Sequence, residues 1–310
     1  MIEENSTLWQ LLNVFWLRPE TALWREIDIR AMSKFQFLSP SLDLGCGDGI
    51  FSFIRGGGHF PQSFDAFRDV TKIDQYYQNI DVFDTCLDGS GIAIAKPPLY
   101  QIDMGFDFKS NLLGKAQKLG LYKSLCQGNA NNRLPFADCS FNSVFSNILY
   151  WLDSPQDVIS EIARIMKPGA RACLMVPNNT IAEFSFYNQL YSTHTQYKFL
   201  EIIDRGRFSN NIRHASSLSK WCKIFKEAGL SVDRHSRHLS KLTIQIWDIG
   251  LRPIFPILLE MANELSDEKL IFIKRKYMQI MAEFLDPLLE IDVNNPSGEE
   301  PGFHCFELSK

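Results

Sequence analysis

The chain has 310 residues, of which 45% are hydrophobic and 22% charged, as expected for a globular protein with a sizeable core. Its formal net charge of −4 argues against a large basic surface, and we expect no nucleic-acid partner. The seven cysteines include no Cys-x-x-Cys pair. We therefore expect no metal site, and scattered free thiols favour a cytoplasmic protein.

The first 40 residues predict a helical cap. Ser6 or Thr7 can cap a helix, and Pro19 ends or kinks it before a second helix that runs to about Phe35. The apolar run Leu8–Leu17 follows glutamates and not basic residues, which disfavours a signal peptide. No apolar run reaches the length of about 18 residues that a membrane-spanning helix needs.

From residue 41 the pattern alternates between strands and helices. Strands are expected at Ser41–Leu44, Leu99–Met104, Ser124–Gln127, Ser143–Leu149, Arg171–Val176, Ser231–Arg237 and Phe303–Leu308. Helices are expected at Lys109–Leu119, after the capping residue Ser154, and at Leu218–Ala228. Such alternation predicts a parallel sheet with right-handed crossovers.

The strongest local signal is the segment Asp43-Leu44-Gly45-Cys46-Gly47-Asp48-Gly49, where the first strand ends. Its glycines permit a positive φ and let a ligand approach the backbone. In a dinucleotide-binding protein such a turn faces a pyrophosphate. Here Asp43 and Asp48 would repel phosphate, and they suit a ligand that carries an ammonium and a sulfonium.

Three later segments strengthen that interpretation: Gln127-Gly128-Asn129-Ala130, Leu134-Pro135-Phe136-Ala137-Asp138, and Glu161 to Gly169. In order and spacing the sequence resembles the class I S-adenosylmethionine-dependent methyltransferases, above all the small-molecule enzymes typified by ubiquinone and menaquinone biosynthesis. The resemblance implies S-adenosyl-L-methionine as cofactor. It also implies an α/β fold with a Rossmann-like, doubly wound sheet of seven strands, six parallel and the last antiparallel, with helical additions.

The resemblance further implies roles for individual residues. The methionine part of the cofactor is expected at Asp43, Gly45, Cys46, Gly47, Asp48 and Gly49. An acidic residue at the end of the second strand should accept hydrogen bonds from both ribose hydroxyls. Our choice is Asp103 over Asp84 and Asp107, although it follows Gly45 by 58 residues where about 20 is usual. Asn129 and the Ala130 N–H are expected at the adenine, and Asn147 and Ile148 beside the methyl group.

Two segments exceed a minimal fold of this kind, so we place the cofactor-binding core at 41–239 and 301–310. Residues 56–98 form an insertion with three consecutive glycines. Its ends should lie beside the cofactor turn, and it can be a lid or a surface decoration. Residues 240–300 form an apolar helical insertion. It can be a cap on the domain, a homodimer contact, an acceptor tunnel or a membrane-surface helix.

Methyl transfer from a sulfonium requires an acceptor aligned behind the methyl carbon and the exclusion of water. A hydroxyl or carbon acceptor also loses a proton, which calls for a base. The candidate bases are His59, Tyr150, His194 and His214, followed by Asp153, Glu183 and Tyr187. Each also has a structural interpretation: His214 can cap a helix, His194 can be solvated, and Tyr150 can shape the acceptor wall.

We expect O- or C-methylation of a small-molecule, glycan or lipid-like acceptor, with two alternatives. Asn147-Ile148-Leu149-Tyr150 loosely resembles the Asn-Pro-Pro-Tyr motif of nucleic-acid adenine methyltransferases, but it lacks both prolines. A catalytically silent module that binds S-adenosylmethionine and acts through partners would keep the same intact glycine turn. Turnover of an acceptor separates an enzyme from a silent module, and salt-dependent RNA affinity would indicate a nucleic-acid enzyme.

Overall fold

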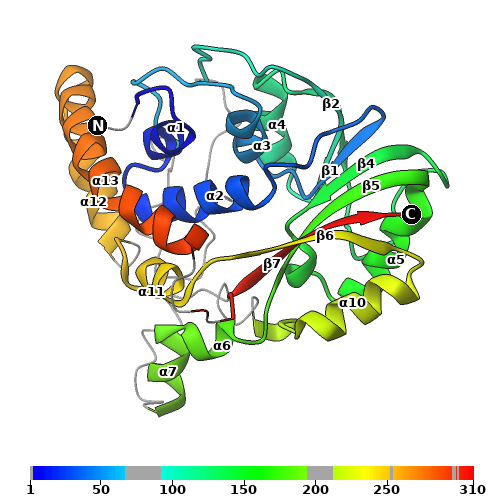
Figure 1. Cartoon of the computed structure of the whole chain (residues 1–310). Helices are drawn as coiled ribbons and strands as arrows, with labels where there is room; N and C mark the ends of the chain where they lie inside the picture. The colour runs from blue at the N-terminus through cyan, green and yellow to red at the C-terminus, as the bar shows by residue number, and fades with distance from the viewer. Residues whose placement is uncertain (1–2, 67–91, 194–211, 252–253, 295–297, 299) are drawn as a thin grey trace.

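A computed structural model describes the chain apart from residues 1–2, 67–91, 194–211, 252–253, 295–297 and 299 (Figure 1). The expected site residue His194 and the alternative ribose ligand Asp84 lie outside the described residues. So does the middle of the 56–98 insertion.

The centre of the molecule is one sheet with the strand order β3-β2-β1-β4-β5-β7-β6. Its strands are β1 (Ser41–Leu44), β2 (Ile102–Asp107), β3 (Tyr122–Gln127), β4 (Phe141–Ser146), β5 (Met166–Pro177), β6 (Ser231–His238) and β7 (Phe303–Ser309). β1 to β5 are parallel, whereas β7 runs antiparallel to both β5 and β6. The expected sheet of six parallel strands and an antiparallel last strand is confirmed.

Helices cover both faces of this sheet (Figure 1). On one face lie α2 (Pro19–Ala31) and α3 (Ile50–Arg55), and Phe51 of α3 stacks on Phe145 of β4. On the other lie α5 (Pro155–Ile165) and α10 (Leu218–Glu227), and Phe225 of α10 packs against Phe306 of β7. α4 (Ser110–Lys118) connects β2 to β3. Because both faces are covered, the parallel strands can be apolar on both sides.

Two helix starts follow from their capping residues. The Ser6 Oγ accepts a hydrogen bond from the Trp9 N–H at 3.2 Å and begins α1 (Thr7–Val14). The Ser154 Oγ accepts from the Asp157 N–H at 3.4 Å, with proline at the first helical position of α5. These are the donors that a helix start leaves without an intrahelical partner, which explains why the sequence pattern located the starts well.

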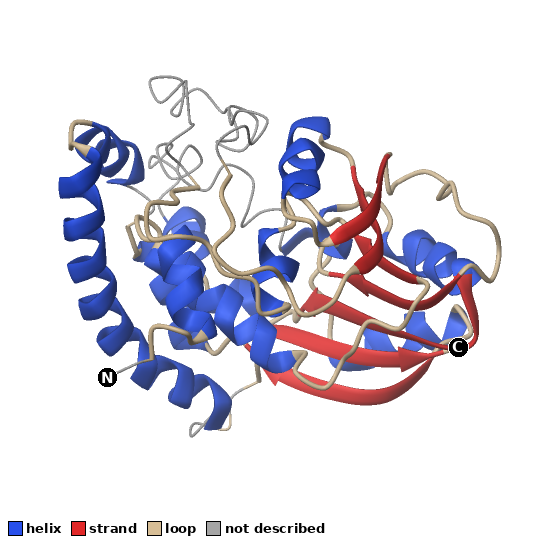
Figure 2. Cartoon of the chain, turned by 90° about the horizontal axis from the view of Figure 1, so that it is seen from above, coloured by secondary structure: helices blue, strands red, loops and turns tan. Residues whose placement is uncertain are grey.

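A helical layer stands to one side of the sheet (Figure 2). It contains α1, α2, α11 (Lys241–Ile249), α12 (Phe255–Asn263) and α13 (Asp267–Asn294), whose apolar side chains share one buried cluster. The layer also includes polar contacts, since the Leu251 N–H donates to Glu20 Oε2 at 3.4 Å. Helices from residues 1–40 and from 240–300 therefore pack as one layer. The short helices η3 (Leu149–Trp151), α6 (Ile181–Phe184) and α7 (Phe186–Thr193) follow β4 and β5.

The longest helix, α13, has 28 residues. Even so, within the described ranges no helix has an apolar stretch long enough to cross a bilayer.

The described ends of the 56–98 insertion lie at the far end of α3 from the glycine-rich turn. The Leu99 N–H donates to the Gly56 carbonyl at 2.7 Å, and His59 bridges to Lys96. The expectation that these ends lie beside the turn is wrong. The six residues of α3 carry the chain roughly 9 Å away before the insertion begins.

The start of the insertion is held against the helical layer. Lys274 of α13, which is 2% exposed, donates to the backbone carbonyls of Gln62 and Phe64. Burial lowers the pKa of Lys274 to about 8, against the opposing effect of the Asp65 charge. The Trp16 indole N–H donates to Asp65 Oδ2 at 2.8 Å. The expectation that the 56–98 insertion is a lid stays a prediction, since residues 67–91 lie outside the described ranges.

Candidate cofactor site

The glycine-rich turn lies at the carboxyl edge of the sheet, between β1 and α3. β1 has β2 as one neighbour and β4 as the other, so the strand order reverses at β1. Open α/β sheets bind ligands at such a switch point, outside the carboxyl ends of the strands.

Three glycines shape this turn differently. Gly45, Gly47 and Gly49 have φ values of 87°, 56° and 75°, in the left-handed region that favours glycine. A Cβ on Gly45 would come within 2.5 Å of the Ile148 side chain, and one on Gly49 within 2.9 Å of the Tyr122 ring. A Cβ on Gly47 would meet no described atom within 4 Å. Gly47 thus presents bare backbone to an open space that a side chain would fill.

Asp107 ends β2 directly beside this open space. Its Oδ2 accepts a hydrogen bond from the Gly47 N–H at 2.9 Å, and its Oδ1 accepts one from the Lys109 N–H at 2.9 Å. Each carboxylate oxygen has two lone pairs, so both keep capacity to accept from a ligand. The side chain is half-buried, which leaves it accessible from the carboxyl edge.

Asp103 lies at the opposite end of the same strand. Its Oδ2 accepts from the Ser41 N–H and Oγ, both at 2.9 Å, and its Oδ1 accepts from Lys123 Nζ at 2.7 Å. Burial alone would raise the pKa of Asp103, but these bonds outweigh it and lower the pKa to about 2. Placing Asp103 at the end of the second strand was wrong, because β2 continues to Asp107. Asp103 instead joins β2 to the starts of β1 and β3.

Asp43 lies beneath the turn and is 2% exposed. Its Oδ2 accepts from the Ser52 Oγ at 2.6 Å and from the Tyr122 hydroxyl at 2.7 Å. Burial raises the pKa of Asp43 to about 6, although both hydrogen bonds act in the other direction. Sequence reasoning missed both donors. A lone serine in the apolar stretch Ile50–Arg55 was a signal for Ser52, whereas nothing local indicated Tyr122.

Gly105 explains how Tyr122 reaches Asp43. It lies in the middle of β2, and a Cβ there would come within 2.9 Å of the Tyr122 ring and 3.0 Å of Cys46 Sγ. A glycine inside a strand often marks such a close approach. The ring of Tyr122 therefore crosses over β2 at the one position without a side chain.

Asp48 adds a third carboxylate at the turn. Its Oδ1 accepts from the Ile50 N–H at 3.1 Å at the start of α3. Burial raises the pKa of Asp48, an effect that the charges of Lys115 and Arg25 oppose. Burial and the neighbouring carboxylates also raise the pKa of Cys46, so its thiol stays protonated. With three carboxyl groups around one turn, a cationic ligand is favoured over a phosphate.

The loop after β3 carries the two residues expected at the adenine. The Gly128 N–H donates to the Asp107 carbonyl at 3.0 Å, which ties this loop to the end of β2. The exposed Asn129 side chain accepts from the Asn131 N–H at 2.9 Å, so Asn129 forms a turn. Ala130 is buried at 6% exposure.

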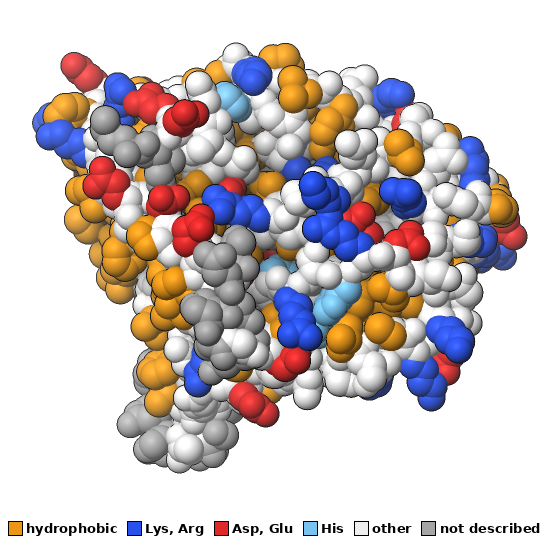
Figure 3. Space-filling view, in the orientation of Figure 1, with side chains coloured by type: hydrophobic (Ala, Val, Ile, Leu, Met, Phe, Trp, Pro, Cys, Tyr) orange, Lys and Arg blue, Asp and Glu red, His pale blue; other side chains and the backbone are white. Residues whose placement is uncertain are grey.

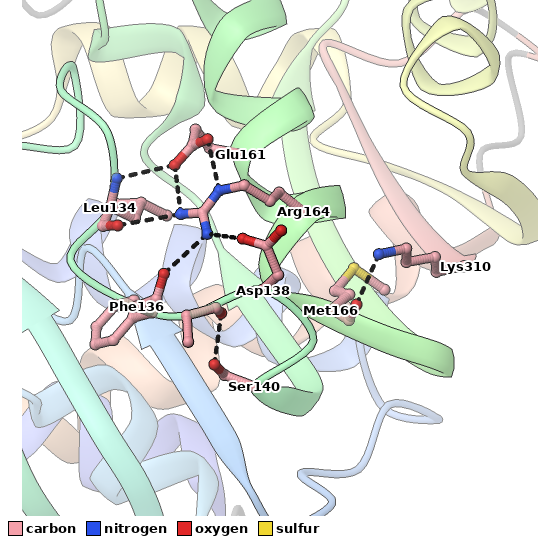
Figure 4. A network of polar contacts seen from close by, with 9 residues as sticks. Leu134, Phe136, Asp138, Ser140, Glu161, Arg164, Met166 and Lys310 are labelled. Carbon is pink, nitrogen blue, oxygen red and sulfur yellow. Dashed lines mark hydrogen bonds and ion pairs between the residues drawn. The ribbon is translucent and has the colours of Figure 1, made fainter.

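Arg164 of α5 holds the continuation of this loop (Figure 4). Its guanidinium donates to the carbonyls of Leu134 (3.1 Å) and Phe136 (2.9 Å), and to the carboxylates of Asp138 and Glu161. Glu161 Oε2 in turn accepts from the Leu134 N–H at 3.0 Å. Two motifs of the sequence, at 134–138 and 161–169, are thus two sides of one polar network.

The segment after β4 carries residues expected beside the methyl group. Ile148 packs over the first glycine of the turn, and Asn147 is half-buried. Tyr150 is 9% exposed, and its ring packs edge-on against Phe303 at the start of β7, with centroids 5.5 Å apart. Trp151, next to it, is 49% exposed. An aromatic wall therefore borders the carboxyl edge at β4 and β7.

The structure separates the histidine candidates. His214 bonds to the backbone of Leu152 after β4, and Ser216 nearby donates to the carbonyl of Pro177 at the end of β5. In the described part of the chain, the buried Nε2 of His214 has no hydrogen-bond partner. Burial lowers the pKa of His214, which keeps the ring neutral. His59 lies at the far end of α3 instead.

The remaining candidate bases differ in exposure, with Tyr187 buried and Asp153 and Glu183 exposed. Across the described ranges, no group of three or more His, Cys, Asp or Glu side chains could hold a metal ion.

Parts of this chain are similar to known proteins. Residues 86–174 match the methyltransferase domain family, a stretch that begins before β2 and ends within β5. The ubiquinone/menaquinone biosynthesis C-methyltransferase UbiE of Desulfotalea psychrophila is 38% identical over 76 residues, 23% of this chain and 30% of that protein. The match therefore spans less than a third of the length of that relative.

Solved structures are similar over nearly the whole chain at low identity. A methyltransferase from Thermotoga maritima is 15% identical, with 98% of this chain and 99% of that chain covered and a TM-score of 0.48. One from Mesorhizobium loti is 13% identical, with 91% and 96% covered and a TM-score of 0.44. Residues 86–174 therefore match a methyltransferase domain, and the sheet with its antiparallel last strand agrees with the fold expected of the class I S-adenosylmethionine-dependent methyltransferases.

Proposed function

We propose that the chain transfers the methyl group of S-adenosylmethionine to a small-molecule acceptor. The observation that carries the proposal is the pairing of Gly47 with Asp107 at the carboxyl edge. Bare backbone faces an open space there, and a carboxylate with spare lone pairs borders it. This combination fits a ligand that has a ribose and a positively charged amino-acid part.

Each part of the cofactor has a counterpart among these residues. The Asp107 carboxylate would accept from the ribose hydroxyls, in the role that sequence reasoning gave to Asp103. The turn from Gly45 to Gly49 would hold the methionine part above Asp43. Ala130 would line the adenine, with its N–H toward the ring edge. Bound there, S-adenosylmethionine supplies an electrophilic methyl group.

The aromatic wall supports an apolar or aromatic acceptor of small size. Tyr150 and Phe303 form its buried part and Trp151 its exposed part. The relative from Desulfotalea psychrophila is named for C-methylation in quinone biosynthesis, which agrees with an aromatic acceptor. The net charge of −4 gives no support to a nucleic-acid acceptor.

Calorimetric titration with S-adenosylhomocysteine tests the cofactor part of the proposal. Gly47→Arg should weaken binding by at least a hundredfold, roughly 2.7 kcal/mol, because the side chain fills the open space. The matched control is Gly120→Arg. Gly120 has φ 64° and likewise no atom near its Cβ, but it lies at the opposite edge, after α4. Equal affinity in the two variants would remove the turn from the site.

The release of S-adenosylhomocysteine in the presence of phenolic, quinol and amine acceptors tests turnover. Wild type should turn over at least one phenolic or quinol acceptor, and Gly47→Arg should not. Tight binding without any turnover would instead indicate the silent binding module.

A further inference from the structure

The outer face of α13 carries an apolar stripe that the fold does not cover. Ile273, Ile280, Phe284 and Ile291 are 42%, 68%, 62% and 37% exposed. Their spacing of seven, four and seven residues puts them on one side of the helix, as in the seam of a coiled coil. Hydrophobic side chains gather along this edge of the molecule, over α12 and α13 (Figure 3).

The opposite side of α13 is fixed in the core. Met278, Ala282, Leu285 and Leu289 are each at most 1% exposed and belong to the cluster shared with α1 and α2. The helix is therefore held in place by its inner face, and the stripe is a surface that this chain leaves open among its described residues.

The stripe is symmetric along the helix. Ile280 and Phe284 each lie two residues from position 282, and Ile273 and Ile291 each lie nine residues from it. An antiparallel helix centred on position 282 would therefore place Ile280 opposite Phe284 and Ile273 opposite Ile291. Every large apolar residue of the stripe would meet another one.

Beyond its acidic first turn at Asp267 and Glu268, the charges on α13 are antisymmetric about the same point. From 269 to 280 every charged residue is basic, and from 281 to 291 every one is acidic. In the antiparallel arrangement Lys276 lies within two residues of the position opposite Glu290, an axial offset of roughly 3 Å. An anionic lipid surface would be repelled by the acidic half, so the pattern favours a protein partner with the same helix reversed.

We propose that α13 pairs with α13 of a second copy of this chain, antiparallel about a two-fold axis at position 282. A two-fold contact must be self-complementary, and both the stripe and the charges meet this condition. The same register brings the two copies of Glu283 close together at the axis. That contact is unfavourable and makes the register testable.

The test is the oligomeric state of the full chain, measured by sedimentation velocity over a range of concentrations. Wild type should form a dimer, and Ile280→Asp should raise its dissociation constant by at least about tenfold. Gln279→Asp is the matched control, since it adds the same charge at an exposed neighbour off the stripe and should leave the dimer intact. Unchanged thermal melting of both variants excludes misfolding.

Charge exchange tests the register. Lys276→Glu and Glu290→Lys should each weaken the dimer, and the double variant should restore it. Glu283→Gln should strengthen the dimer. The proposal would be overturned if wild type stayed monomeric up to about 100 µM, because a specific dimer has a much lower dissociation constant. The proposal would also be overturned if Ile280→Asp lost binding to anionic vesicles while its oligomeric state stayed that of wild type.

Discussion

At the scale of single residues, Asp103 and Asp107 lie four positions apart on β2 and have different hydrogen-bond partners. Among the described residues, Asp107 accepts hydrogen bonds from two backbone N–H groups, those of Gly47 and Lys109. Asp103 is bonded by Ser41 and by the ammonium of Lys123. A carboxylate already paired with a cation has little left to offer a ligand, whereas one held by turn amides is oriented and still able to accept.

We expect Asp107→Asn to weaken S-adenosylhomocysteine binding by at least tenfold. Each charge-assisted bond to a ribose hydroxyl contributes roughly 1.5–3 kcal/mol, and the amide keeps an oxygen for the Gly47 N–H. Asp103→Asn should leave affinity unchanged and lower the free energy of unfolding by about 1–2 kcal/mol. Calorimetry and urea unfolding of both variants check this, and the reverse assignment of effects would exclude Asp107.

The buried Asp43 gives the free protein a pH dependence of known sign. Its pKa is about 6 in the folded chain and about 3.9 in an unfolded one. Between these values only the folded state holds the proton. The contribution of Asp43 to the free energy of unfolding therefore falls as pH rises from about 4 to about 6, and it is constant above that.

Asp43→Asn removes this contribution and keeps an oxygen for Ser52 and Tyr122. The stability of the variant relative to wild type should rise by up to about 3 kcal/mol between pH 4 and 6.5. Urea unfolding at several pH values measures the difference. A difference that does not change with pH would mean that Asp43 titrates alike in both states.

At the scale of elements, Arg164 decides whether the loop between β3 and β4 keeps its shape. Its guanidinium is the common donor to two carbonyls and two carboxylates, and the side chain is 17% exposed. The loop it holds begins at the adenine-side residues Asn129 and Ala130. Stability and cofactor binding should therefore both depend on α5.

Arg164→Lys keeps the charge but loses the planar fork that bonds several partners at once. We expect it to lower the free energy of unfolding by about 2 kcal/mol and to weaken S-adenosylhomocysteine binding less than Asp107→Asn does. Arg171→Lys, an exposed position on β5, is the control. Thermal melting and calorimetry on the same samples measure stability and affinity. Equal losses in the Arg164 and Arg171 variants would contradict the role of the network.

At the scale of the whole molecule, local signals predicted the elements, and long-range contacts decided the site. The caps at Ser6 and Ser154 are local hydrogen bonds, so their pattern is visible in a few residues. The end of β2 is not visible locally. In the sequence, Gly105 looks like the end of a strand. In the structure it lies inside β2, because the Tyr122 ring from β3 leaves no room for a side chain there. Asp103 was preferred to Asp107 because it lies at the end of the expected strand Leu99–Met104, ahead of a helix whose sequence resembles that of the family.

The insertion was misplaced for a related reason. Its first residues follow the cofactor turn closely in sequence, but a short helix reverses the chain direction between them. Residues 60–65 are held by Asn13 of α1, by Trp16 just after that helix, and by Lys274, which lies more than 200 positions away. No local pattern announces a partner at that separation.

The shared helical layer also has a consequence for how the protein is made. α1 and α2 pack against helices that begin at residue 241, so part of their apolar surface lacks its native partner during most of synthesis. At roughly 5–20 residues per second, a ribosome needs on the order of 10–50 s to supply that partner. Throughout that interval the part of the first two helices that packs on α11 and α13 stays uncovered on the nascent chain, where a ribosome-associated chaperone could bind it.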